Sequence, residues 1–400
     1  MRFGTSPSER AGVRLSTELS RVCADVHCCG VLQAIGLRPT WPGSHGSGTE
    51  QEDQMDFAHT RRRRIGARRR MAALAVAAVA TSTTLAACGS SDSGGEAAKG
   101  GSAKGKTVML LAGANSNTWA GYFNKIFTQE MKAEGVTVKP MLTLSPTEQV
   151  QQFREAIAQK PDAIVITLLD NKATILGIKQ AKQAGVPVIT FDGPPDPSVR
   201  DQVRSVESDN PALGRLAAEN LIEGLRAQGK KKANIIAIGG LKAMLLTQQR
   251  QEAFDEEMKK APEYRVLETT DSQWNPTLAL QQAQQLIAKH GKGNIDAAYG
   301  MSDYLAIPII QAAKQAGMKV GGKDGLLVVS GNCFKAGIDA IKKGEMYGTN
   351  TEDPGTLAKE TADYTTKFLT GDDVEQHVTI KEERINPDNV DQFAEQCSHA

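Results

Sequence analysis

Short apolar runs alternate with longer amphipathic segments along most of the chain. Runs of strand length occupy residues 107–112, 163–169, 187–191, 233–238, 264–269, 296–299 and 326–330. Apolar residues recur at helical spacing in residues 119–134, 150–157, 174–184, 211–228, 247–260, 276–290 and 305–316. Strands that are apolar throughout and alternate with helices predict parallel sheets covered by helices on both faces. The pattern therefore predicts an α/β fold, and its two successive series suggest two similar, doubly wound, Rossmann-like lobes.

Polar and aromatic residues gather where these strands end. They are Asn115, Asn117, Trp119, Asp170, Asp192, Arg250, Trp274, Ser302, Asp303 and Asn332. Doubly wound sheets bind ligands beyond the carboxyl ends of their strands, so these residues predict a cleft for a polar small molecule. Core packing of the tryptophans, and helix capping by Asp192 and Asp303, are the structural alternatives.

The side-chain types at the strand ends suit a polyhydroxyl ligand. Carboxylates and Arg make strong, charge-assisted hydrogen bonds to hydroxyl groups, and indole faces can cover the C–H patches of a sugar ring. The sequence contains no glycine-rich phosphate loop and no recognisable Ser/His/Asp set, and its six His are scattered. We therefore expect a binding protein, not an enzyme, without a cofactor and without a metal site.

The N-terminal part differs sharply in composition from the rest of the chain. Residues 1–87 contain twelve Arg and no Lys, and removing them leaves 35 basic and 39 acidic residues. The remaining chain is therefore weakly acidic without a basic stripe, so nucleic acid is not an expected partner. Its length of about 300 residues favours two domains.

Residues 55–87 have the three parts of a signal peptide. Arginines crowd residues 61–70, an apolar run shorter than a membrane span covers residues 71–87, and Leu85-Ala86-Ala87-Cys88 follows. The last motif resembles the lipoprotein cleavage box of bacteria, which implies lipidation of Cys88 and anchoring to the membrane. Residues 88–106 are rich in Gly, Ser, Ala and Lys and predict a flexible tether. Export by a twin-arginine route is the alternative.

Residues 1–54 have no helical or strand period. We interpret them as a non-native or disordered extension, with Met55 a better translation start and a genuine cleaved extension as the alternative. Cys23, Cys28 and Cys29 have no suitably spaced partners for a metal ion.

Several motifs resemble those of one family. They are Val108–Leu111 with Asn117–Trp119, Gly185–Asp192, Ser208–Asn210 and Gln249–Phe254. From Val108 to Glu352 the chain resembles the type I periplasmic solute-binding proteins of ABC transporters, in particular the ribose-binding branch. The resemblance implies a lobe of residues 107–208 plus 353–379, a second lobe of residues 209–352 plus 380–400, and a three-strand hinge near Ser208, Glu352 and Ile380.

The resemblance also implies a role for individual residues. Six polar side chains would form hydrogen bonds to ligand hydroxyl groups: Asn117, Asp192, Arg250, Ser302, Asn332 and Glu352. The two indole rings of Trp119 and Trp274 would stack on opposite faces of the sugar ring. The chain departs from the ribose-binding pattern at five positions. Ribose binders carry Arg at the position of Gly193 and an aromatic residue at the position of Ala120. They carry Asn, Asp and Gln at the positions of Ser302, Asn332 and Glu352, respectively. These departures make D-ribose itself doubtful and leave open a larger sugar, a polyol or a ligand with a cationic group.

The implied function is that of an exported, lipid-anchored, monomeric protein on the outer face of the bacterial membrane. It would bind a monosaccharide or polyol and present it to the permease and ATPase subunits of an ABC importer. A receptor for chemotaxis or another sensory system has the same fold, and an amino sugar or nucleoside is an alternative ligand. A transcriptional repressor would need a helix-turn-helix where the signal peptide stands.

After Cys88 only Cys333 and Cys397 remain. Export favours disulfides. In the implied topology the C-terminal tail returns to the lobe that holds Cys333, so we expect a Cys333–Cys397 bridge, with two unpaired thiols as the alternative.

Overall fold

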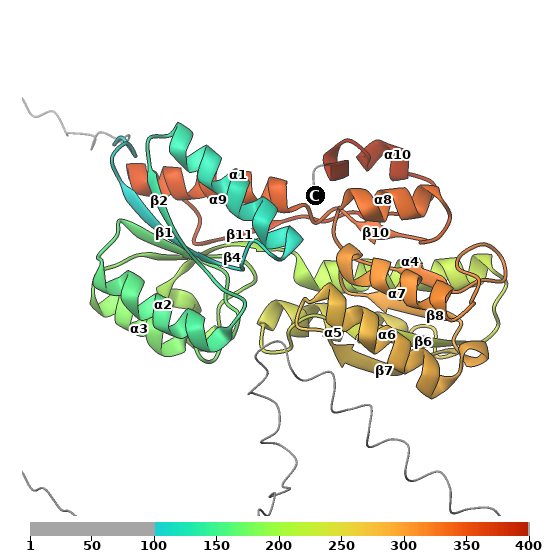
Figure 1. Ribbon diagram of the computed structural model, residues 1–400. Helices are drawn as coiled ribbons and strands as arrows, with labels where there is room; N and C mark the ends of the chain where they lie inside the picture. The colour runs from blue at the N-terminus through green and yellow to red at the C-terminus, as the bar shows by residue number, and fades with distance from the viewer. Residues whose placement is uncertain (1–100, 399–400) are drawn as a thin grey trace, which may run out of the picture. The chain divides into compact units, whose positions relative to one another are not determined.

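A computed structural model describes residues 101–398, which all fall within one compact unit. Cys88, the predicted signal peptide and the N-terminal extension lie outside these residues. Strands and helices alternate along the described chain (Figure 1). None of its helices is both long enough and apolar enough to cross a membrane.

The first sheet has six parallel strands in the order β11-β5-β4-β3-β1-β2. Their bounds are Thr107–Ala112 (β1), Thr137–Leu142 (β2), Ala163–Ile166 (β3), Val188–Asp192 (β4), Arg204–Ser208 (β5) and His377–Ile380 (β11). The associated helices are Thr118–Ala133 (α1), Pro146–Ala158 (α2), Ile175–Gln183 (α3) and Pro354–Thr370 (α9), with a short 3-10 helix at Pro197–Gln202.

Helices cover both faces of this sheet. Helices α1 and α9 lie on one face, and α2 and α3 lie on the other (Figure 1). Successive residues of β1 divide between the two cores: Val108 and Leu110 pack with Phe123 of α1, whereas Met109 packs with Phe153 of α2. This alternation requires a strand that is apolar at every position, as the sequence pattern indicated.

Strand β2 was not predicted from the sequence. Its residues are mostly exposed or half-buried, and it pairs only with β1, so it is an edge strand without an apolar run. Pro140 interrupts its hydrogen-bonding pattern, which an edge position tolerates.

The second sheet has four parallel strands in the order β7-β6-β8-β9. Their bounds are Ala233–Gly239 (β6), Tyr264–Asp271 (β7), Ala297–Gly300 (β8) and Leu327–Val329 (β9). The associated helices are Asn210–Ala227 (α4), Leu245–Met258 (α5), Pro276–His290 (α6), Asp303–Gln315 (α7), Lys335–Lys342 (α8) and Val390–Phe393 (α10). Short 3-10 helices occupy Lys292–Asn294 and Gln396–Ser398. Helices α4 and α5 pack together, as do α6 and α7.

The described chain passes between the two sheets three times. Strand β5 ends at Ser208 just before α4, and β11 ends at Ile380 just before β12 (Arg384–Ile385). The third passage joins β10 (Thr349–Asn350), which pairs antiparallel with β12, to α9. The two sheets therefore carry the two lobes, and these three segments connect them.

The structure joins Cys333 and Cys397 in a disulfide. Both cysteines are fully buried. The bond ties the C-terminal 3-10 helix to the loop that follows β9.

Candidate functional site

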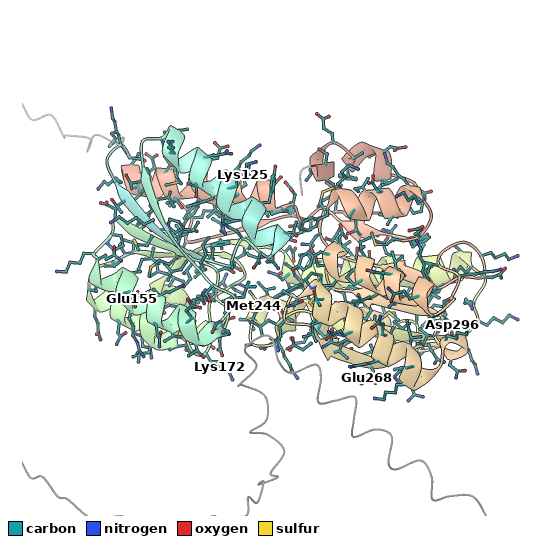
Figure 2. All side chains as sticks on the ribbon, in the orientation of Figure 1. Lys125, Glu155, Lys172, Met244, Glu268 and Asp296 are labelled. Carbon is teal, nitrogen blue, oxygen red and sulfur yellow. A yellow bond between two sulfur atoms is a disulfide. The ribbon has the colours of Figure 1, made fainter. Side chains whose placement is uncertain are left out.

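A cavity lies where strand ends of both sheets face one another. Its volume is about 610 Å³, including the part open to solvent. The residues that line it are Gly113, Asn117, Trp119, Ala120, Leu144, Thr167, Leu169, Asp192, Leu241, Met244, Leu246, Arg250, Gln273, Trp274, Tyr304, Asn332 and Glu352. Met244 is buried at the centre of the structure, whereas Lys125 and Glu155 are exposed on its outside (Figure 2).

Seven of the eight predicted ligand residues line this cavity. Ser302 does not, because it occupies the N-cap position of α7, where its side chain is fully buried. Asp303 beside it also has a structural role: its carboxylate accepts hydrogen bonds from Thr349 Oγ1 at 2.7 Å, from Phe334 N at 2.9 Å and from Ser330 Oγ. These bonds hold together the loops at the ends of β9 and β10.

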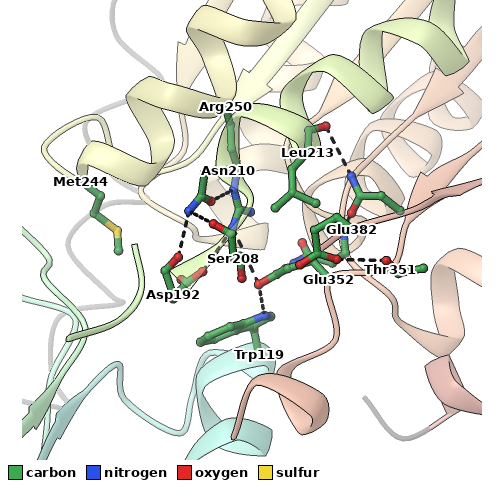
Figure 3. Close-up of polar contacts among 12 residues, drawn as sticks. Trp119, Asp192, Ser208, Asn210, Leu213, Met244, Arg250, Thr351, Glu352 and Glu382 are labelled. Carbon is green, nitrogen blue, oxygen red and sulfur yellow. Dashed lines mark hydrogen bonds and ion pairs between the residues drawn. The ribbon is translucent and has the colours of Figure 1, made fainter. Parts of the chain in front are cut away.

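Arg250 of α5 is the centre of the polar network. Its Nε donates to Asn210 Oδ1 at 2.6 Å, and its Nη2 lies 3.3 Å from Asp192 Oδ1 and 3.7 Å from Glu352 Oε1. Figure 3 shows these side chains pointing toward one another from different segments. Since Asp192 ends β4 and Arg250 belongs to the second lobe, the network bridges the two lobes.

Trp119 is anchored at both ends. Its Nε1 donates to Glu352 Oε1 at 3.1 Å, and its ring stacks on Phe123 at a centroid distance of 5.6 Å. Phe123 in turn stacks on Phe191 in the core of the first lobe. Trp119 is therefore both a core residue and part of the cavity wall, so the two interpretations of the sequence apply together.

Trp274, between β7 and α6 of the second lobe, also contacts this network. Its carbonyl oxygen accepts a hydrogen bond from Asn117 Nδ2 at 3.2 Å, and the Arg250 guanidinium lies 5.8 Å from its ring centroid. A Cβ atom at Gly240 would come within 2.0 Å of the indole ring. The glycine after β6 is therefore required for Trp274 to adopt this position.

The carboxyl groups of the site compete for one guanidinium. Burial raises the pKa of Asp192 to about 6, although Arg250 opposes the shift. Burial raises the pKa of Glu352 well above its usual value, Arg250 opposes this, and Asp192 adds to it. Burial also raises the pKa of Glu382, in the connection after β11, to about 8. Desolvation disfavours the charged forms, and a single Arg250 cannot compensate all three.

Left-handed backbone conformations cluster at the cavity. Among the described residues other than glycine, φ is positive at Asp192 (69°), Gln273 (54°), Trp274 (57°) and Asn332 (78°), which all line it, and at Lys160 (47°), which does not. Such conformations cost free energy and are retained where the surrounding structure imposes them, often at ligand sites. The cluster is thus a marker of the site that is independent of side-chain chemistry.

Sequence reasoning missed several residues of the site. Tyr304 accepts a hydrogen bond from Asn117 Nδ2 at 3.4 Å, and Asn210 both binds Arg250 and donates to the Asp192 carbonyl oxygen at 2.8 Å. Leu169, Met244 and Leu246 form an apolar cluster in the cavity wall. Tyr304 and Asn210 follow strand ends closely, which was an available signal, but nothing local marks the apolar cluster.

The fold also brings Ser205 beside His377, a pair that resembles part of a catalytic triad. Ser205 Oγ lies 2.8 Å from His377 Nδ1, but Ser205 is fully buried inside the first sheet. Glu207 bonds Ser205 and Arg200 and does not orient the histidine. The arrangement lacks the base–orienter geometry of a nucleophile site. Within residues 101–398, no group of three or more His, Cys, Asp or Glu residues could hold a metal ion.

Comparisons with known proteins agree with this architecture. A family model described as a periplasmic binding protein domain matches residues 108–373. The ribose import binding protein of Haemophilus influenzae is 26% identical over 238 residues, which are 59% of this chain and 75% of that protein. The galactofuranose-binding protein of Escherichia coli is 26% identical over 208 residues, which are 51% of this chain and 64% of that protein.

Solved structures resemble the chain in fold. The crystal structure of a galactofuranose-binding protein superposes with a TM-score of 0.67 at 24% identity, covering 73% of this chain and 98% of the other. At this identity the likeness concerns the arrangement of the two lobes and not the ligand.

Proposed function

The chain belongs to the periplasmic binding protein domain family, and on that premise we propose that it is the exported solute-binding component of an ABC importer. Its ligand is a monosaccharide or polyol, held in the cavity between the two lobes. The observation that carries the proposal is the convergence of Asn117, Trp119, Asp192, Arg250, Trp274, Asn332 and Glu352 on that one cavity.

The cavity combines the groups that carbohydrate recognition requires. Two indole rings, Trp119 and Trp274, provide apolar surfaces, and the carboxylates of Asp192 and Glu352 can accept bonds from hydroxyl groups. Arg250 is nearly fully buried, so its bonds are made away from competing water. The names of the ribose- and galactofuranose-binding relatives support a sugar of this general size.

The departures from the ribose-binding pattern favour a ligand other than D-ribose. Gly193 stands where ribose binders carry Arg, and a Cβ atom at this position would come within 2.9 Å of Leu246 Cβ. An arginine side chain therefore needs a rearrangement of the cavity wall at Leu246. The loss of that cation also leaves Arg250 as the only positively charged residue that lines the cavity.

Contacts between the lobes support a closing mechanism. Arg250 of the second lobe binds Asp192 of the first, and Asn117 of the first binds the Trp274 carbonyl group of the second. A ligand that touches both sides binds the closed arrangement better and shifts the population toward it. The closed form is then the one that the permease recognises.

The anchor is part of the same proposal. Cys88 is lipidated after removal of residues 55–87, and the tether to the outer face of the membrane ends before Gly101. The predicted tether of residues 88–106 is too long at its C-terminal end, because Gly101 N donates to Thr370 O at 2.9 Å and Ala103 is buried in the core of the first lobe. Support comes from the order of arginine cluster, apolar run and cleavage box in the sequence. Mass spectrometry of the membrane fraction tests it, because an unmodified Cys88 contradicts lipid attachment.

A thermal-shift screen of the purified protein tests the ligand class. The panel contains pentoses, hexoses, polyols, amino sugars and nucleosides. A specific ligand at about 100 times its Kd stabilises the folded protein by about 2.7 kcal/mol, and the melting temperature rises accordingly. Stabilisation by a nucleoside alone, or by no member of the panel, contradicts the proposed function.

A further inference from the structure

The groups that line the cavity carry an excess of negative charge. Asp192 and Glu352 are its acidic residues and Arg250 is its basic residue. Arg250 lies nearer to Asp192, at 3.3 Å, than to Glu352, at 3.7 Å. With both carboxylates ionised, one negative charge is left over at the Glu352 side of the cavity. Glu382, behind the cavity, adds to the negative potential felt by Glu352.

The hydrogen-bonding groups that line the cavity include buried acceptors without a donor. Glu352 Oε2 and Asn332 Oδ1 are buried and have no hydrogen-bond partner among the described residues. In contrast, the indole N–H of Trp119 donates to Glu352 Oε1, that of Trp274 to Met244 Sδ, and the Asn117 amide donates to protein oxygens. The site therefore has free acceptors, and several of its donors are already engaged. A buried acceptor without a partner is costly, so a ligand rich in donors fits best.

From these two imbalances we propose that the cavity selects a sugar or polyol that carries a protonated amine, with the ammonium group bound to Glu352 Oε2. An ammonium group supplies three donors, no acceptor and the missing positive charge. The Trp119 N–H already occupies Glu352 Oε1, which leaves Oε2 for the ammonium group. Asn332 Oδ1 accepts from a second donor of the ligand. The inference rests on the proposed function and specifies its substrate class.

Protonation of Glu352 is the competing way to remove the charge. Burial raises the pKa of Glu352, so this carboxyl group favours either a proton or a cation beside it. A protonated Oε2 becomes a donor, however, and it would then need an acceptor from the ligand. An uncharged sugar fits that form, and an amine fits the ionised form, so matched ligands distinguish them.

Calorimetric titration with matched ligand pairs tests the inference. The pairs are D-glucosamine with D-glucose, D-galactosamine with D-galactose, and D-glucamine with D-glucitol. The titrations are run at neutral pH, because acid would protonate Glu352, whose pKa is raised, and remove the charge that binds the amine. In at least one pair the amine is expected to bind roughly tenfold more tightly, the ratio that one charge-assisted bond contributes. The N-acetylated amino sugars, which keep the nitrogen but lose the charge, are expected to lose this advantage.

Variants separate the charge effect from a folding effect. Glu352→Gln keeps an acceptor for the Trp119 N–H and is expected to bring the affinity ratio of the pair close to one. Asn332→Asp adds a carboxylate at the second free acceptor and is expected to increase the ratio. Glu155→Gln changes an exposed carboxylate outside the cavity and serves as the matched control with an unchanged ratio.

The outcomes also separate the two proposals. Neutral members that bind as tightly as the amines in every pair overturn this inference and leave the proposed function standing. A preference for amines that survives in Glu352→Gln overturns the assignment to Glu352. If no ligand of the thermal-shift screen and no member of the calorimetric pairs binds, the proposed function is contradicted, and this inference fails with it.

Discussion

The Asn171 side chain accepts a hydrogen bond at 2.7 Å from the backbone N–H of Leu245, the first residue of α5. Asn171 follows β3 of the first lobe, and its Nδ2 also donates to the Pro194 carbonyl oxygen at 2.8 Å. Its backbone N–H points to Ala243 O at 3.4 Å. Beside these bonds, Leu169 packs on Met244 and Leu246. Asn171 therefore connects the two lobes beside this apolar cluster without lining the cavity.

Asn171→Ala is expected to weaken ligand binding about fivefold. The variant removes an interlobe bond worth about 1 kcal/mol, which destabilises the closed arrangement while the cavity residues stay intact. Calorimetry measures the affinity, and small-angle scattering of the unliganded protein should show a larger radius of gyration. Asn234→Ala, which removes an exposed bond to Asn294 within the second lobe, is the control. Equal affinity of Asn171→Ala and wild type would show that this contact does not act in closure.

Gly240→Ala is expected to abolish ligand binding while the protein remains folded. The added methyl group would overlap the Trp274 ring, with the nearest atom at 2.0 Å, so the indole must leave its place. The loss should match that of Trp274→Ala in a titration with the best ligand of the thermal-shift screen. Gly293→Ala, where a Cβ atom meets nothing within 4 Å, is the control. Normal binding by Gly240→Ala would mean that Trp274 is not a binding surface.

The unliganded protein is expected to lose stability as the pH rises from about 4 to about 8. Burial raises the pKa of Glu382 to about 8 and that of Asp192 to about 6, above the values of about 4 expected in the unfolded chain. The folded state then binds more protons than the unfolded state in this range, so the free energy of unfolding falls with rising pH. His377, with a lowered pKa, acts in the opposite sense.

Glu382→Gln isolates this contribution. Glutamine can still accept the hydrogen bond that Thr351 Oγ1 donates at 3.0 Å, but it has no charge to desolvate. The plot of melting temperature against pH should therefore be flatter for Glu382→Gln than for wild type, and the variant should be the more stable at pH 8. Each kcal/mol of difference corresponds to roughly 2–4 °C. If the plots of melting temperature against pH are parallel for Glu382→Gln and wild type, the pH dependence of stability arises from groups other than Glu382.

Breaking the Cys333–Cys397 bond is expected to lower the stability by about 4 kcal/mol. The bond closes a loop with a sequence separation of 64 residues, and the chain entropy of an unfolded loop of that length gives this figure. Denaturant titration of the Cys333→Ser/Cys397→Ser double variant measures it. Because Cys333 adjoins Asn332, the affinity for the ligand should also fall. A midpoint equal to that of the wild-type protein would exclude a stabilising role.

Local chemistry was sufficient to determine the lobes and most of the site. Apolar runs such as Ala163–Ile166, and the helical spacing of apolar residues within α1, are patterns among residues that are close together in the sequence. The sequence alone therefore predicts a doubly wound α/β fold. Parallel strands place their carboxyl ends along one edge, which is why Asp192 and Asn332 could be assigned to the cavity. Edge strand β2 escaped prediction because its exposed residues carry no apolar pattern.

Only the tertiary structure decided which polar groups face the ligand and which hold the fold. The Ser302 side chain is buried and does not line the cavity, whereas Tyr304, two residues away, does. The bonds of Arg250 to Asn210 and of Asn171 to Leu245 join residues far apart in sequence. No local period encodes such pairs, because their free energy depends on burial and orientation that exist only once both lobes are assembled.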